Sequence, residues 1–211
     1  MITIGGIRSI SKVSMAVVPF MAIFYILACV TVLALNVQHL PEAVSQILSN
    51  AFTGTAATGG FAGATIMLAL QAGVARGVFS NESGLGSAPI AAAAAKTDSC
   101  VEQGLVCMTG TFFDTIIICT MTGLTLVITG VWQGDVAGAA MTNLAFTQGM
   151  GSQLGLYLVN IGLLFFAFTT IIGWNYYGER CTEYLLGVKA IKPYRYIFIL
   201  LVAVGALLHL D

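Results

Sequence analysis

Two adjacent hydroxyl side chains, Thr169 and Thr170, lie inside a long apolar stretch of the chain. Hydroxyl oxygens are hard ligands, the kind that small hard cations such as Na⁺ take in proteins. Trp174 follows Thr170 by four residues, so on a helix its indole lies one turn away on the same face. The pattern therefore indicates a Na⁺ site beside an aromatic wall. The alternative is that each hydroxyl only bonds the carbonyl four residues earlier in its own helix.

Glycines interrupt a second uncharged stretch, residues 43–75, around positions 53–63. This stretch is longer than the roughly 20 residues that one straight membrane span needs, so we expect two half-helices around an unwound centre. Backbone groups freed at membrane depth must face protein, water or a ligand. Gly59 and Gly60 suit such a centre, because glycine lets a ligand approach the backbone closely. The alternative is that Gly59 and Gly63 merely bring two helices into close contact.

Asp114 is the one acidic residue well inside an apolar stretch of this chain. A carboxylate there costs about 2.5–3.5 kcal/mol on membrane-insertion scales, which makes it a functional suspect. It could be protonated, paired with a neighbouring helix or reached by water. A role in coupling and a structural hydrogen bond to a helix end both stay open.

The composition of the chain indicates the kind of structure in which these residues lie. Of the 211 residues, 58% are hydrophobic and only 8% are charged, and the mean hydropathy is +0.93. Soluble domains carry about 25% charged residues, so a water-soluble fold is excluded. The net charge of −1 leaves no basic excess for binding nucleic acid. We expect an all-α polytopic membrane protein in contact with the lipid bilayer.

The apolar stretches predict five transmembrane helices in a single domain, the second of them discontinuous. All eight Lys and Arg residues precede the first stretch, lie between the second and third, or follow the fourth up to Arg195 at the beginning of the fifth. Because positive charges favour the cytoplasmic side, the N-terminus should be cytoplasmic and the C-terminus outside. The predicted spans cover residues 13–35, 43–75, 104–132, 154–178 and 194–210.

The sequence favours no enzyme and no bound cofactor. It has no His-Glu-x-x-His pattern and no Gly-x-Ser-x-Gly serine paired with a histidine in a neighbouring span. Between the second and third spans we expect a turn and then a short helix that begins near Pro89. Residues 137–148, in the loop before the fourth span, could form an interfacial helix.

Four motifs together resemble the alanine or glycine:cation symporter family, also called sodium:alanine symporters. The resemblance covers nearly the whole chain, and its second motif is highly specific. The motifs are TGGFAGAT at 58–65, GVARGVFSNESGLGSAP at 73–89, FFDT at 112–115 and FTTIIGWNYYGER at 168–180.

The resemblance implies a LeuT-like inverted-repeat fold, of which this chain would supply helices five to nine. It implies symport of Na⁺ with a small neutral amino acid, alanine or glycine, across the cell membrane. Thr169 and Thr170 would hold Na⁺. Trp174 would line the substrate pocket, and Gly59, Gly60 and Phe61 would border the substrate.

The first four family helices are absent from this sequence, so the resemblance implies a fragment or one product of a split gene. Its partners would then include the missing helices of the same transporter. The alternative is a non-transporting membrane subunit, or a degraded fragment, in which the small residues only pack against other helices.

Overall fold

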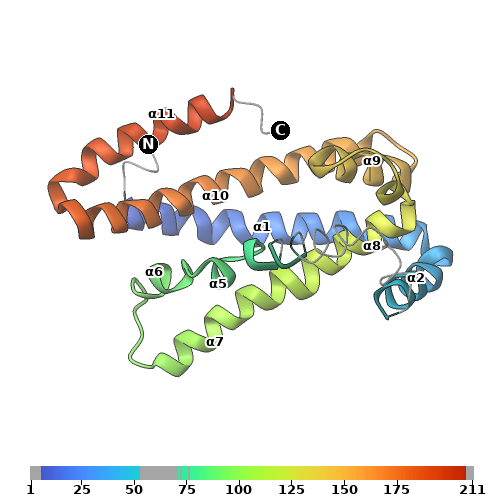
Figure 1. Cartoon of the computed structure of the whole chain (residues 1–211), viewed down its shortest axis with the longest axis horizontal. Helices are drawn as coiled ribbons and strands as arrows, with labels where there is room; N and C mark the ends of the chain where they lie inside the picture. Colours follow the sequence, from blue (N-terminus) through green and yellow to red (C-terminus); the bar gives the residue numbers. More distant parts are fainter. Residues whose placement is uncertain (1–5, 53–70, 72, 76, 208–211) are drawn as a thin grey trace. The chain divides into compact units, whose positions relative to one another are not determined.

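The protein is described from a computed structural model, which covers residues 6–52, 71, 73–75 and 77–207. Every regular element in these residues is a helix, so the predicted all-helical class is confirmed. Within the described residues, three helices are long and apolar enough to cross a membrane, at Ser9–Leu35, Cys100–Thr129 and Leu154–Leu186. Figure 1 labels the principal helices along the chain.

The first long helix, α1 (Gly6–Leu35), extends the predicted span 13–35 by about two turns at its start. It contains Pro19. Beyond a short 3₁₀ turn, η1 (Val37–His39), comes α2 (Leu40–Phe52), the first part of the predicted discontinuous span. The predicted break, with Gly59, Gly60 and Phe61, lies outside the described residues.

The predicted turn and short helix before the third span are present. Asn81 begins the one-turn helix α5 (Glu82–Leu85), because its side chain accepts a hydrogen bond from the amide of Ser83. Gly86 ends that helix with a φ of +74°, a conformation that glycine adopts without strain. The helix α6 (Ala88–Ala92) then begins with Pro89 in its first turn, as predicted.

The third apolar stretch forms one continuous helix made of three segments. These are α7 (Cys100–Thr111), the π-helical segment η2 (Phe112–Cys119) and α8 (Thr120–Thr129). In a π-helix each amide donates to the carbonyl five residues earlier, and such turns often mark functional sites. Gly130, with a φ of +69°, ends α8 before the short η3 (Val131–Gln133). A helix, α9 (Gly138–Met150), is present in the loop before the fourth span, where a helix was predicted.

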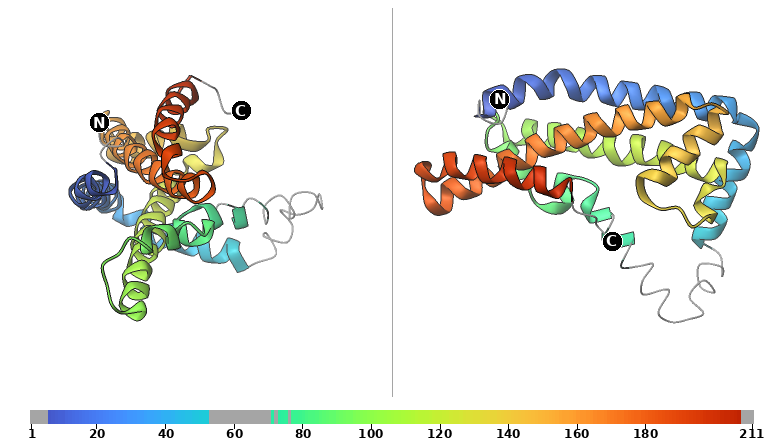
Figure 2. Two further views of the ribbon diagram at one scale, coloured as in Figure 1. Left: turned by 90° about the vertical axis from the view of Figure 1, so that its left-hand side faces the viewer. Right: turned by 90° about the horizontal axis from the view of Figure 1, so that it is seen from above.

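The third long helix, α10 (Leu154–Leu186), contains the fourth predicted span and continues about two turns past the end of that span at residue 178 (Figure 2). After the short η4 (Val188–Ala190) comes α11 (Ile191–Gly205), which begins before the predicted fifth span and is too short to count as a membrane span by length.

The chain divides into two compact units. One unit contains residues up to 22 and from 162 onward. In it, the Phe20 and Phe165 rings meet edge to face with centroids 5.5 Å apart, which packs the beginning of α1 against α10. The other unit spans residues 23–161. There Phe146 of α9 is fully buried and stacks near Tyr25 of α1, whose hydroxyl lies 2.9 Å from that of Thr122.

Candidate functional site

Thr169 lies on the face of α10 that packs against the beginning of α1. Its hydroxyl donates to the backbone carbonyls of Phe165 and Phe166, each 3.0 Å away, and also lies 3.7 Å from the sulfur of Met21. The back-bonded conformation considered from the sequence is therefore present. A hydroxyl has only one proton, so its oxygen keeps lone pairs that can still ligate a cation.

Thr170 points to another side of α10. Its hydroxyl donates to the carbonyl of Phe166 at 2.8 Å, and the side chain is exposed. Trp174, one turn further on, is also exposed at 45% and meets the ring of Tyr177 edge to face. The structure thus brings Thr170 and Trp174 onto one open face, as their spacing predicts, whereas Thr169 turns toward α1.

Asn175 follows Trp174 directly and is fully buried. Neither its amide oxygen nor its amide nitrogen has a hydrogen-bond partner among the described residues. Burying an amide without hydrogen bonds costs free energy. Asn175 therefore destabilises α10 locally, next to the tryptophan that is predicted to line the substrate pocket. Asn175 is not among the predicted site residues, because its burial depends on tertiary packing that spacing in the sequence does not show.

Charged side chains join the end of α10 to α11. The Glu179 carboxylate is 2% exposed and accepts hydrogen bonds from Arg195 at 2.7 and 2.8 Å and from Arg180 at 2.8 Å. Arg180 also pairs with Glu183 at 2.5 Å, and its guanidinium lies 5.5 Å from the centre of the Tyr176 ring. This network joins the end of α10 to the beginning of α11, beyond the apolar part of α10.

Asp114 lies in the π-helical segment η2, and one of its carboxylate oxygens is buried without a hydrogen-bond partner among the described residues. Residues from the turn before the third span contact the same segment. The Asn81 amide donates to the hydroxyl of Thr115 at 3.2 Å, and the hydroxyls of Ser83 and Thr111 lie 3.1 Å apart. The sequence pattern singles out Asp114 but not these contacts between the turn and the helix, because they join residues about 30 positions apart in the sequence.

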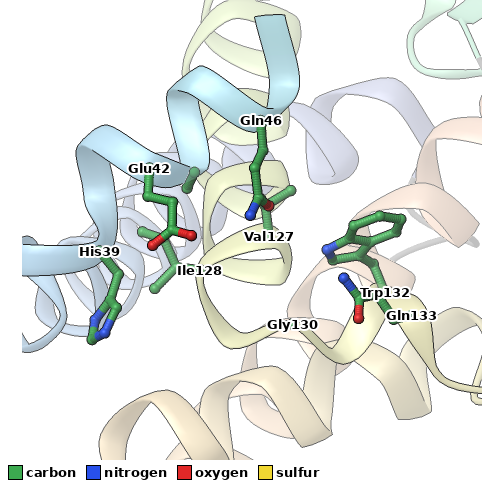
Figure 3. A pocket seen from close by; sticks show the side chains of 9 residues that line it. His39, Glu42, Gln46, Val127, Ile128, Gly130, Trp132 and Gln133 are labelled. Atoms are coloured by element: carbon green, nitrogen blue, oxygen red, sulfur yellow. The ribbon is translucent and has the colours of Figure 1, made fainter. Parts of the chain in front are cut away.

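A pocket of about 190 Å³ opens between α2, α8 and η3 (Figure 3). Its lining includes the carboxylate of Glu42 and the amide of Gln46 from α2. From η3 it includes the indole of Trp132 and the amide of Gln133. Such a lining suits a small polar solute. Of the residues predicted for Na⁺ or substrate, the three that the structure describes, Thr169, Thr170 and Trp174, do not line it.

Comparison with known proteins agrees with the motifs. The sequence profile described as the sodium:alanine symporter family matches residues 1–211. An uncharacterized transporter of Haemophilus influenzae is 56% identical over 212 residues, which cover 100% of this chain and 46% of the relative. The sodium/alanine symporter AgcS of Methanococcus maripaludis is 51% identical over 209 residues, or 97% of this chain and 45% of the relative.

A more distant relative extends the comparison. The amino-acid carrier protein AlsT of Bacillus subtilis is 35% identical over 208 residues, which cover 98% of this chain and 43% of the relative. The chain therefore spans about half the length of the curated relatives that it matches.

Proposed function

Because this chain belongs to the sodium:alanine symporter family, we propose that it supplies cation- and substrate-binding residues to a sodium-coupled carrier of a small neutral amino acid, alanine or glycine. The carrier works in the cell membrane, with the N-terminus of this chain in the cytoplasm and its C-terminus outside. Family membership supports a role in membrane transport. The printed function of the 51% identical relative, a sodium/alanine symporter, supports Na⁺ and alanine as the transported pair.

The single observation that carries the site is the shared open face of Thr170 and Trp174 on α10. Both side chains are exposed, and they lie one helical turn apart. The Thr170 hydroxyl donates its proton to the Phe166 carbonyl, so the lone pairs of its oxygen are available to accept or to ligate a cation. In our proposal it ligates Na⁺, and the indole of Trp174 forms one wall of the substrate pocket.

Thr169 completes the proposed cation site from the side of α10 that faces α1. Because Thr169 lies where α10 packs against α1, a cation bound to its hydroxyl would couple cation binding to the packing of these two helices. Gly59, Gly60 and Phe61 supply the opposite border of the substrate in our proposal. Symport then follows if Na⁺ and the amino acid bind together, since one positive charge moved inward across −100 mV contributes about 2.3 kcal/mol.

The test uses a full-length relative, the Methanococcus maripaludis symporter, with substitutions at the positions aligned to this chain. Thr170→Val keeps the side-chain volume and removes the oxygen. We expect it to raise the Na⁺ concentration for half-maximal alanine uptake by roughly tenfold, because a ligand to a charged group is lost. Trp174→Ala should instead change the preference among alanine, glycine and serine.

Thr129→Val is the matched control. Thr129 is also a helix threonine bonded to the carbonyl four residues earlier, at 2.8 Å, but it lies in α8. Its substitution should leave the Na⁺ dependence unchanged. If Thr169→Val and Thr170→Val behave like this control while expression is normal, the two threonines serve packing only and the cation assignment is wrong.

A further inference from the structure

The pocket between α2, α8 and η3 combines an apolar side with polar side chains. Ala43 of α2, which is 3% exposed, and Val127 and Ile128 of α8 form the apolar part of its lining. Gly130 ends α8 with a φ of +69°, so the chain turns directly into η3, whose side chains complete the lining. The packing of two helices and one glycine turn therefore build this pocket.

Four polar side chains of the lining make no hydrogen bond or ion pair with any residue that the structure describes. They are Glu42, Gln46, Trp132 and Gln133. Glu42 and Gln46 are four residues apart and leave the same side of α2, and the other two side chains lie across from them (Figure 3). Polar groups that meet at a cavity without partners in their own chain can bond to a ligand.

The charge of the lining favours a cation. Glu42 is its one carboxylate, and no Lys or Arg lines the pocket. The carboxylate and the amide oxygens of Gln46 and Gln133 are acceptors from three side chains, and a primary ammonium group has three N–H donors. The indole of Trp132 can add a cation–π contact. The apolar side of the pocket suits a short alkyl chain and offers no ligand to a bare metal ion.

We propose that this pocket binds a small molecule through its primary ammonium group, with Glu42 as the counter-ion. Its volume of about 190 Å³ is below the roughly 300 Å³ of pockets for drug-sized ligands, so the ligand has only a few heavy atoms. A simple alkylamine and the ammonium end of a small amino acid share this chemistry. The lining contains none of Thr169, Thr170 and Trp174, so the site goes beyond the proposed transport function and does not rest on it.

Tryptophan fluorescence of the whole chain in detergent micelles tests this directly. The chain has two tryptophans, so Trp174→Phe leaves Trp132 as the one reporter and removes the indole of the proposed substrate site. In Na⁺-free buffer, we expect ethylammonium to change the Trp132 emission saturably, with half-saturation at millimolar concentration because the ligand has so few atoms. Lactate, in which a hydroxyl replaces the ammonium group of alanine, should cause no change.

Alanine distinguishes the two sources of the ammonium group. A saturable response to alanine as well as to ethylammonium supports the proposal and identifies a small amino acid as a ligand of this pocket. A response to ethylammonium without one to alanine also supports it and restricts the ligand to simple amines. Because Na⁺ and the indole of Trp174 are both absent, neither result depends on the proposed transport site.

Glu42→Gln removes the counter-ion and should raise the half-saturating concentration about tenfold or more. Glu102→Gln is the matched control, because Glu102 is an exposed carboxylate in the first turn of α7, as Glu42 is in α2, and does not line the pocket. It should leave binding unchanged. Gln133→Ala removes an acceptor from the exposed η3 and should weaken binding about fivefold, so it decides the test if Glu42→Gln fails to fold.

Three results would overturn the proposal. The first is the absence of a saturable response to both ethylammonium and alanine. The second is an equal response to lactate or to NaCl, which would mean that the pocket does not select an ammonium group. The third is unchanged half-saturation in a folded Glu42→Gln variant or, if that variant does not fold, in Gln133→Ala.

Discussion

Arg195 of α11 donates two hydrogen bonds, 2.7 and 2.8 Å long, to the two carboxylate oxygens of Glu179 on α10. The Glu179 side chain is 2% exposed and that of Arg195 is 17% exposed, so the carboxylate is withdrawn from water and the guanidinium largely so. Removing one partner of a buried pair leaves an uncompensated charge, which is more damaging than the loss of the attraction alone.

We therefore expect Arg195→Gln to lower the free energy of unfolding by about 3 kcal/mol. Thermal unfolding in detergent measures the loss. Arg180→Gln is the control, because Arg180 bonds the same carboxylate but is 37% exposed, and it should have a smaller effect. Equal losses for the two variants would show that α11 is not held by the Glu179–Arg195 pair.

Close packing at Gly149 gives a second prediction. A Cβ at this glycine of α9 would lie 2.5 Å from the Cγ1 of Val32, and its carbonyl accepts a hydrogen bond from Asn36 at 2.8 Å. Gly149→Ala should destabilise the chain by about 1–3 kcal/mol through overpacking. Gly123→Ala, where the new Cβ meets nothing within 4 Å, should be neutral or stabilising by up to about 1 kcal/mol.

A double variant separates overpacking from other causes. Val32→Ala frees the space that the new methyl group needs, so it should recover part of the loss in Gly149→Ala. Additive losses in the double variant would argue against a direct clash.

The predicted orientation is tested with cysteine labelling. Cys100 is exposed at the beginning of α7, in the connection assigned to the cytoplasm. In a variant that keeps only this cysteine, a membrane-impermeant maleimide should label it after cell lysis and not before. Asp135→Cys in a cysteine-free background, placed in the connection assigned to the outside, should be labelled in intact cells. The reverse pattern would invert the topology.

Transport by the chain itself gives a further prediction. Because the chain spans about half the length of its curated relatives, we expect residues beyond the matched half to be needed for a complete pocket. The purified chain in liposomes should not accumulate alanine when an inward Na⁺ gradient is applied. Co-reconstitution with the part of the Methanococcus maripaludis sodium/alanine symporter that this chain does not match should restore uptake. Strong accumulation by the chain alone would contradict this expectation.

The sequence predicted helices better than it predicted where they end. Long uncharged runs identify α1, the α7–α8 helix and α10, because burial in lipid demands such runs. The end of α10 was placed at residue 178, where the apolar run stops. The helix continues because Glu179, Arg180 and Glu183 neutralise one another along it and with Arg195. Charge marks the end of the apolar span and not of the helix.

The candidate site was only partly visible in the sequence. Spacing correctly placed Thr170 and Trp174 on one face, since four residues make one helical turn. It did not show that Thr169 turns toward Met21 or that the Asn81 turn reaches η2, because both depend on tertiary contacts.

The π-helical segment also changes how substitutions and length variants should be interpreted. A turn closed over five residues instead of four contains one extra position, and each residue of an α-helix rotates the direction of a side chain by about 100°. If the helical positions of α7 are extended at 3.6 residues per turn through residues 112–119, they therefore assign the side chains of α8 to the wrong face of the helix. A homologue one residue shorter in this region can keep every contact of both flanking segments, whereas the same deletion inside α8 would rotate all residues beyond it out of alignment.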